Sequence, residues 1–312
     1  MYFPYLRCKQ FELLALRDLS ELLGQSQKIS PILEPVKKSM ASLERALESL
    51  VANGVNFTII LNPIVGELNE SQALIADFVN NKLAFYNNFQ LGLLVCEDTD
   101  INDFDNILSR IDVAKPITLI NLERANDLDL LLVWAIGKYI KYTLYFDTIP
   151  TRRYRGLITP ENKVILADNF KSRKKNSDYL LREDEFFSEE HLYYTEDGNI
   201  GFSDYLTIGK DFAEGGFLPY AVAIHLTYID TSDSTLRIHH FVSDSNKDNI
   251  DVPGKFGEAL EKLMTFIEDE GIDTQAAEEF RDHYRNGHYP GLGSLKKLSI
   301  KNHLELLVKL LA

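Results

Sequence analysis

The sequence predicts an α/β protein with a TIM-barrel-like (β/α)8 fold, irregular late connections and a helical C-terminal cap. Short, nearly continuous apolar segments alternate with longer segments whose apolar residues recur at helical spacing. Strands that are apolar on both faces are typical of a parallel sheet covered by helices. Eight such strand segments can be counted, which is the number in a closed barrel. An open doubly wound sheet is the alternative, because the sequence does not show closure.

The predicted elements follow one another along most of the chain. Residues 2–7 are β-prone, but Pro4 favours an edge or lead-in strand there. The eight barrel strands are predicted at residues 29–36, 56–62, 90–96, 117–122, 143–146, 164–167, 200–208 and 220–227. Helices are predicted at residues 11–23, 43–51, 71–80, 103–111 and 128–140.

The alternation becomes irregular after residue 167. Residues 180–199 are acidic and rich in Tyr and are predicted to form a helix or loop, and residues 237–242 read as a short strand. Helices are predicted at residues 255–270, 274–284 and 299–311. We therefore expect a barrel domain at residues 1–252 and a C-terminal helical segment at residues 253–312 that packs on the barrel.

Charge and cysteine content restrict the partners. A formal net charge of −14 argues against a surface that tracks nucleic acid. Cys8 and Cys96 are the only cysteines and form no CxxC motif, which favours reduced thiols in a cytoplasmic protein. No segment reaches the roughly 18 apolar residues of a membrane span, so we expect no membrane association.

Acidic side chains follow several predicted strands. Because the C-terminal ends of barrel strands gather at one mouth, we predict Glu34, Asp147, Asp168 and Asp204 as catalytic acids, bases or ligands of a divalent cation, with Mg²⁺ favoured by oxygen ligands. The other interpretation is helix capping. Capping is favoured for Glu97, Asp98 and Glu123, which directly precede predicted helices.

A basic loop follows the strand at residues 164–167. Arg173, Lys174 and Lys175 reverse the charge of this acidic chain and are predicted to bind an anionic ligand. Pairing of the basic loop with the acidic segment at residues 183–190 is the alternative. His239 and His240 point to opposite faces if extended, so at most one of them reaches a given site.

Five blocks resemble a family of bacterial and phage proteins known as the beta protein family. They read YFPYLRCKQFELLAL, PILEPVK, ADNFKSRKKNSDY, GFSDYLTIG and LPYAVAIHLTY, in this order from residue 2 onward. The resemblance implies a setting among phage and mobile-element genes but no reaction. The positions that it singles out are Arg7, Glu12, Glu34, Lys37, Asp168, Arg173, Asn176, Asp178, Tyr179, Asp204 and His225. The resemblance thereby adds Arg7, Lys37, Asn176, Asp178 and His225 to the residues predicted to bind the anionic ligand.

Three functional hypotheses follow. The first is a phage-defence or mobile-element protein that recognises an anionic ligand at the barrel mouth, such as a nucleotide, a nucleic-acid end or a phosphoester. The second is a metal-assisted phosphoester hydrolase that uses the acidic residues at the strand ends. The third is a non-catalytic structural partner of a co-encoded effector protein.

Overall fold

The structure is a computed structural model that describes residues 1–69, 71–149, 152–157, 162–215 and 218–312, with all side chains there except those of residues 152, 153 and 155. It divides into two compact units. The barrel unit contains Met1–Leu13, Ser20–Ala167 and Tyr193–Asp204. The sheet–helix unit contains Leu14–Leu19, Asp168–Leu192 and Tyr205–Ala312.

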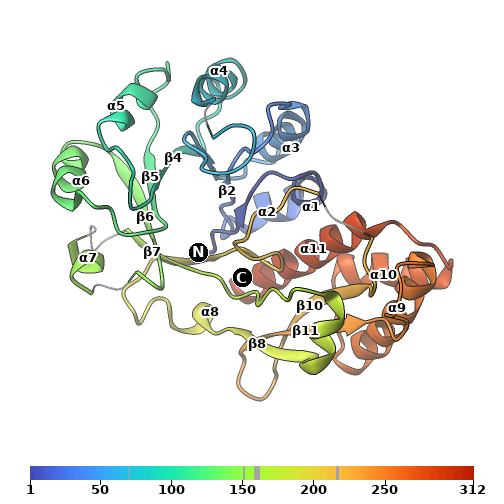
Figure 1. Cartoon of the computed structure of the whole chain (residues 1–312). Coiled ribbons are helices and arrows are strands. Elements are labelled where there is room, and N and C mark those ends of the chain that lie inside the picture. Colours follow the sequence, from blue (N-terminus) through green and yellow to red (C-terminus); the bar gives the residue numbers. More distant parts are fainter. Residues whose placement is uncertain (70, 150–151, 158–161, 216–217) are drawn as a thin grey trace. The chain divides into compact units, whose positions relative to one another are not determined.

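Eight parallel strands form a nearly closed barrel in the first unit (Figure 1). In sheet order they are β1 (Tyr5–Leu6), β2 (Ile32–Leu33), β3 (Phe57–Ile60), β4 (Phe89–Val95), β5 (Ile117–Asn121), β6 (Ile140–Phe146), β7 (Lys163–Ala167) and β9 (Gly201–Asp204). The first and last strands meet at the N-terminus, because Tyr2 forms parallel bridges to both Ile29 and Phe202. The predicted TIM-barrel-like fold is confirmed, in place of an open sheet.

The middle strands form because their side chains are apolar on both faces. Every residue of β3, β4 and β5 is buried. Gly92 in β4 allows a close approach to β3, since a Cβ atom there would lie 2.9 Å from side-chain atoms of both Ile60 and Thr58. These strands are the buried parallel strands that the sequence predicts.

Helices follow most of the barrel strands and lie around their outside (Figure 1). They are α1 (Gln10–Asp18), α2 (Ser20–Ser26), α3 (Ala41–Ala52), α4 (Gln72–Lys82), α5 (Asp103–Leu108), α6 (Leu128–Ala135) and α7 (Arg152–Leu157). Helix α6 ends earlier than predicted because the chain turns at Gly137, which has a φ of +78°, before β6 begins. None of the helices described is both long and apolar enough to cross a membrane.

The identity of two barrel strands differs from the prediction. The segment with Pro4 supplies β1 of the barrel, although it was predicted as an edge strand. Residues 220–227, predicted as the eighth barrel strand, instead belong to a separate antiparallel sheet as β10 (Ala223–Ile229). Burial alternates along the first part of β10, as is typical of a strand with only one covered face. The error arose because the sequence of this segment is nearly continuously apolar, like that of a barrel strand.

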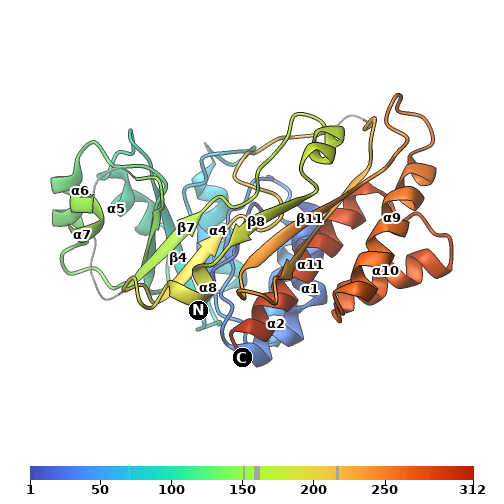
Figure 2. The ribbon, with the colours of Figure 1, turned by 90° about the horizontal axis from the view of Figure 1, so that it is seen from below.

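The sheet–helix unit contains that antiparallel sheet, in the order β10-β11-β8, with β11 (Leu236–Val242) between β10 and β8 (Asp184–Ser188). Helices α9 (Val252–Asp269) and α11 (Leu292–Leu310) pack against it, and α10 (Gln275–Arg285) packs against these two helices (Figure 2). Shorter helices are η1 (Asn176–Leu181) and α8 (Glu190–Tyr193). Residues 180–199, predicted as a helix or loop, thus contain a strand.

One apolar core joins this sheet to the C-terminal helices. Ile224 and Leu226 of β10 share it with Leu263 of α9, Phe280 of α10 and Leu298 of α11. Residues 205–252 therefore group with the C-terminal helices, whereas the sequence placed the domain boundary at residue 252. The predicted packing of residues 253–312 on the barrel stays a prediction.

Candidate functional site

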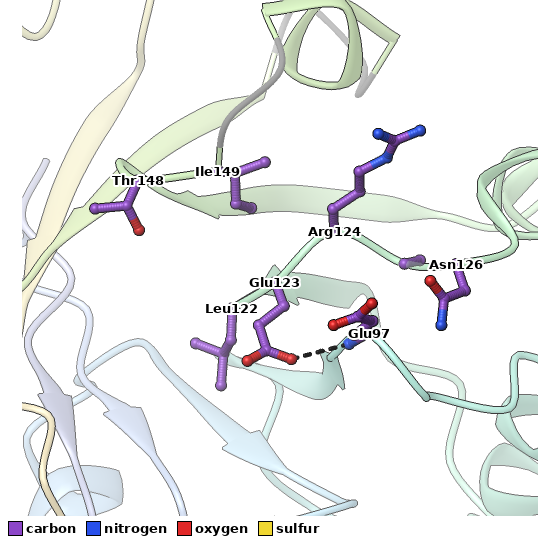
Figure 3. Close-up of a pocket in the computed structure, with 8 residues that line it drawn as sticks. Glu97, Leu122, Glu123, Arg124, Asn126, Thr148 and Ile149 are labelled. Carbon is purple, nitrogen blue, oxygen red and sulfur yellow. Dashed lines mark hydrogen bonds between the residues drawn. The ribbon is translucent and has the colours of Figure 1, made fainter.

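A cavity of about 550 Å³ lies at the C-terminal ends of β4, β5 and β6 (Figure 3). Its lining residues are Glu97, Leu122, Glu123, Arg124, Ala125, Asn126, Thr148 and Ile149. Active sites of TIM barrels are built from the loops at this end of the strands. The volume also falls within the ~300–1,000 Å³ that is usual for small-molecule sites. The cavity is therefore the candidate ligand site of the barrel unit.

Buried hydrogen bonds hold the loop that lines this cavity. Asn121, the last residue of β5, donates from Nδ2 to the carbonyl oxygen of Leu144 at 2.9 Å. Its Oδ1 atom accepts from the hydroxyl of Tyr154 at 2.8 Å, and that hydroxyl accepts from the amide of Ala125 at 3.5 Å. Because Asn121 and Tyr154 are both buried, these contacts fix the chain on either side of Glu123 and Arg124.

The charged groups of the cavity are separated. Glu123 Oε2 accepts a hydrogen bond from the backbone amide of Glu97 at 3.0 Å. Figure 3 shows the carboxylates of Glu97 and Glu123 close to each other, whereas the guanidinium of Arg124 points away from both. The predicted capping role of Glu123 is wrong, because Asp127 is the residue whose side chain caps α6. The cavity thus offers a cationic side and an anionic side.

Cys96 lies beside this acidic side. Burial raises the pKa of its thiol to about 11, with further contributions from Glu123 and Glu34. A thiol with so high a pKa stays protonated at neutral pH and is a poor nucleophile. The same interactions place Glu34, at the end of β2, within electrostatic reach of Cys96.

Glu34, one of the four predicted catalytic acids, lies after β2 and contacts residues in or after β1 and after β3. Its side chain is 1% exposed and accepts from the Tyr5 hydroxyl at 2.9 Å and from the amide of Ile64 at 3.1 Å. Arg7 Nε lies 3.4 Å from Glu34 Oε2. Burial raises the pKa of Glu34, and these partners oppose the shift. Such an arrangement joins the loops after β1, β2 and β3 through one carboxylate.

Other predicted residues of the barrel unit lie in different surroundings. Asp204 is buried and accepts from the Tyr2 hydroxyl at 2.5 Å. Asp147 is exposed at the end of β6. Lys37 is exposed and forms an ion pair with Glu67 at 3.1 Å. Within the described residues no group of three or more His, Cys, Asp or Glu side chains is placed to hold a metal ion, and metal-assisted hydrolysis stays a prediction.

Glu12, one of the positions singled out by the resemblance, is a buried carboxyl near the start of α1. The amide of Lys9 donates to its Oε2 at 3.4 Å. Burial raises the pKa of Glu12 to about 7, although nearby Lys9 and Arg7 oppose the shift. The group therefore changes charge near neutral pH, at the loop that leaves β1.

The predicted basic loop belongs to the sheet–helix unit and is partly neutralised there. Arg173 donates to Glu185 Oε1 at 2.5 Å, and Lys171 Nζ lies 3.4 Å from Glu185 Oε2. Glu185 is 1% exposed. Pairing with the acidic segment at residues 183–190, the alternative to anion binding, is thus found for these two cations. Lys174 and Lys175 are exposed.

Contacts at either end of the loop define its shape. Asp168 Oδ1 accepts from the amide of Lys210 at 3.3 Å. Asp178 Oδ2 accepts from the amide of Lys175 at 3.2 Å at the start of η1, and Asn176 Nδ2 donates to Ala221 O at 2.8 Å. Asp168, Asn176 and Asp178 therefore make contacts that order this segment.

A pair of histidines, buried His240 and half-buried His225, packs against Tyr179 of η1. The Nδ1 atoms of His225 and His240 are 2.8 Å apart, so one imidazole donates to the other. The ring of Tyr179 packs on both, with centroid distances of 4.7 Å to His225 and 4.4 Å to His240. His239 instead faces Phe266 on α9, at a centroid distance of 4.6 Å. As expected, the neighbouring histidines point to different faces.

Burial keeps this pair neutral. It lowers the pKa of His240 to about 4, against the opposing effect of Glu185. The pKa of His225 is lowered well below its usual value, by burial first and then by His240 and Lys296. Both shifts disfavour the protonated imidazole, so protonation works against this packing.

We therefore expect acid to destabilise the sheet–helix unit. Below about pH 6.5 both histidines are protonated in the unfolded chain but stay neutral in the folded protein, which favours the unfolded state. The contribution of the neutral pair to the free energy of unfolding is fully present above that pH, and it falls as the pH drops towards 4. Between pH 7.5 and 5.5 the wild type should lose about 2 kcal/mol more than a His225→Asn, His240→Asn double variant. Urea unfolding of both proteins at the two pH values checks this, and equal losses would contradict it.

Comparisons of the chain with family models, with curated proteins and with solved structures give no match. The site is therefore interpreted from its own geometry. Sequence reasoning missed Arg124, although its position directly after a strand-end carboxylate was a usable signal. It offered the acidic segment at residues 183–190 as a partner of the basic loop but did not single out Glu185, since strand β8 was not predicted.

Proposed function

We propose that the barrel unit binds a small anionic molecule that also carries hydroxyl or amino groups, and that a nucleotide is the ligand class that fits best. The separation of charge in the cavity carries this proposal: Arg124 lies on one side, and Glu97 and Glu123 lie on the other (Figure 3). A guanidinium binds phosphate through paired hydrogen bonds. Carboxylates accept hydrogen bonds from sugar hydroxyls and base amino groups.

The charge of the whole chain favours a small ligand over a long nucleic acid. With a net charge of −14 the protein repels an extended phosphate backbone. One guanidinium in a cavity of about 550 Å³ matches a single phosphate group instead. The resemblance to a family met among phage genes supports a nucleotide sensor in phage–host conflict, with a co-encoded effector as the expected protein partner.

The proposal is tested by calorimetric titration with adenosine 5′-monophosphate and with adenosine. We expect the nucleotide to bind about 10- to 100-fold more tightly than the nucleoside, since a hydrogen bond to a charged group contributes about 1.5–3 kcal/mol. Arg124→Gln should remove this difference between the two ligands. Arg110→Gln, which changes the charge of another exposed side chain, is the matched control and should bind like the wild type.

Two results would overturn the proposal. One is the absence of binding for the 5′-monophosphates of all four common ribonucleosides at millimolar concentration. The other is an equal loss of affinity in the Arg124→Gln and Arg110→Gln variants, because that outcome would reflect net charge and not contact with Arg124.

A further inference from the structure

The sheet–helix unit contains a second cavity, of about 240 Å³, between β11 and α9. Its walls include Glu183, His239, Phe241, Lys262, Phe266 and Asp269. This volume is below the ~300–1,000 Å³ of sites for larger ligands. Only a small molecule or a single chemical group would therefore fit.

Three aromatic rings form one side of this cavity. His239 lies 4.5 Å from Phe241 and 4.6 Å from Phe266 between ring centroids, and the two Phe rings are 5.2 Å apart. His239 Nδ1 is 3.4 Å from Asp184 Oδ2, which orients the imidazole. Burial lowers the pKa of His239, so the ring is uncharged at neutral pH. Faces of aromatic rings carry negative potential and attract cations.

Carboxylates dominate the charge around the same cavity. Glu183 and Asp269 line it and are exposed to solvent. The one lysine of the lining, Lys262, is already neutralised, because its ammonium donates to Asp244 Oδ1 at 2.7 Å and to Val242 O at 2.8 Å. An anion would be repelled here, whereas a cation would meet both carboxylates and aromatic side chains.

We propose that this cavity binds a small organic cation, such as a quaternary ammonium group. The aromatic rings of Phe241, Phe266 and His239 would contact its methyl groups and its charge, and Glu183 and Asp269 would supply the neutralising charge. A bare metal ion fits less well, because the rings of Phe241 and Phe266 provide no ligand atoms for it and because, in the part of the chain that is described, no metal-holding group of side chains occurs. The site is separate from the nucleotide cavity proposed for the barrel unit.

The test compares choline with its uncharged isostere 3,3-dimethylbutan-1-ol, by NMR titration of the full-length protein. Choline should bind about 2- to 30-fold more tightly than the alcohol, since a cation over an aromatic face gains about 0.5–2 kcal/mol. Phe266→Leu should remove most of that preference. Glu183→Gln should weaken choline binding while leaving the alcohol unchanged, and Glu261→Gln, an exposed residue of α9 outside the lining, should have no effect.

Each of three outcomes would overturn the inference. Equal affinity for choline and the alcohol would show that the cavity binds through apolar contacts alone and does not recognise the positive charge. No saturable shift with choline at tens of millimolar would show that no cation site exists. Equal weakening by Glu183→Gln and Glu261→Gln would show a diffuse effect of surface charge. Because Glu183 is exposed, its variant is expected to fold even if Phe266→Leu does not.

Discussion

Replacing Arg173 with Met is expected to lower the free energy of unfolding by about 3 kcal/mol, because it takes the main cationic partner from a buried carboxylate. Glu185 is the reason, because its side chain is 2% exposed and Arg173 is the nearer of its two cations. Without Arg173 the carboxylate keeps only Lys171, whose side chain is 51% exposed. Met retains most of the side-chain volume, so the change acts mainly on charge.

A double-mutant cycle separates the ion pair from general damage. Glu185→Leu combined with Arg173→Met removes both charges and should cost clearly less than the sum of the single changes. Arg182→Met, at an exposed arginine of the same segment, is the control and should stay within about 0.5 kcal/mol of the wild type. Chemical denaturation measures all four variants. Additive costs would mean that Arg173 and Glu185 do not interact.

Glu34→Ala is expected to destabilise the barrel unit by about 3 kcal/mol. The substitution deprives the Tyr5 hydroxyl and the Ile64 amide of their acceptor, and it removes the carboxylate from Arg7, which is 13% exposed. Losing hydrogen bonds to a buried charged group costs about 1.5–3 kcal/mol each before relaxation. Hydrogen exchange should rise first in the loops after β1, β2 and β3.

The matched control is Glu67→Ala. Glu67 also pairs with a cation at a strand end, but the side chains of Lys37 and Glu67 are 48% and 44% exposed. Exposed ion pairs contribute about 0–1 kcal/mol, so this variant should change stability little. If Glu34→Ala proved as mild as Glu67→Ala, the role of Glu34 as a buried link between loops would be wrong.

The fold could be predicted largely because its strands are apolar on both faces. The segments of β3, β4 and β5 read as buried strands from their residues alone. The closing strand could not be predicted, because a segment with Pro4 resembles an edge and because its pairing with Phe202 links residues about 200 positions apart. Residues 220–227 were predicted as a barrel strand because nothing in their own sequence indicates that they pair with an antiparallel strand.

The candidate site was predicted only in part. Position at strand ends correctly indicated the mouth of the barrel, and Glu97 and Glu123 were recognised there but interpreted as caps. Whether a charged group is free or neutralised depends on partners far along the chain. Arg173 was predicted as an anion contact because its partner Glu185 lies in a strand that the sequence did not reveal. Arg124 was not predicted as a binding residue, because a single arginine is a weaker charge signal in the sequence than a run of basic residues.

Hydrogen–deuterium exchange with and without adenosine 5′-monophosphate tests the central claim most directly. This measurement distinguishes two candidate sites of anion binding, the cavity after β4, β5 and β6 and the basic loop. We predict that the nucleotide slows exchange in peptides that cover residues 122–126 and 148–149 and leaves residues 171–182 unchanged. Protection confined to residues 171–182, with none around Arg124, would contradict the assignment of the ligand to the barrel cavity.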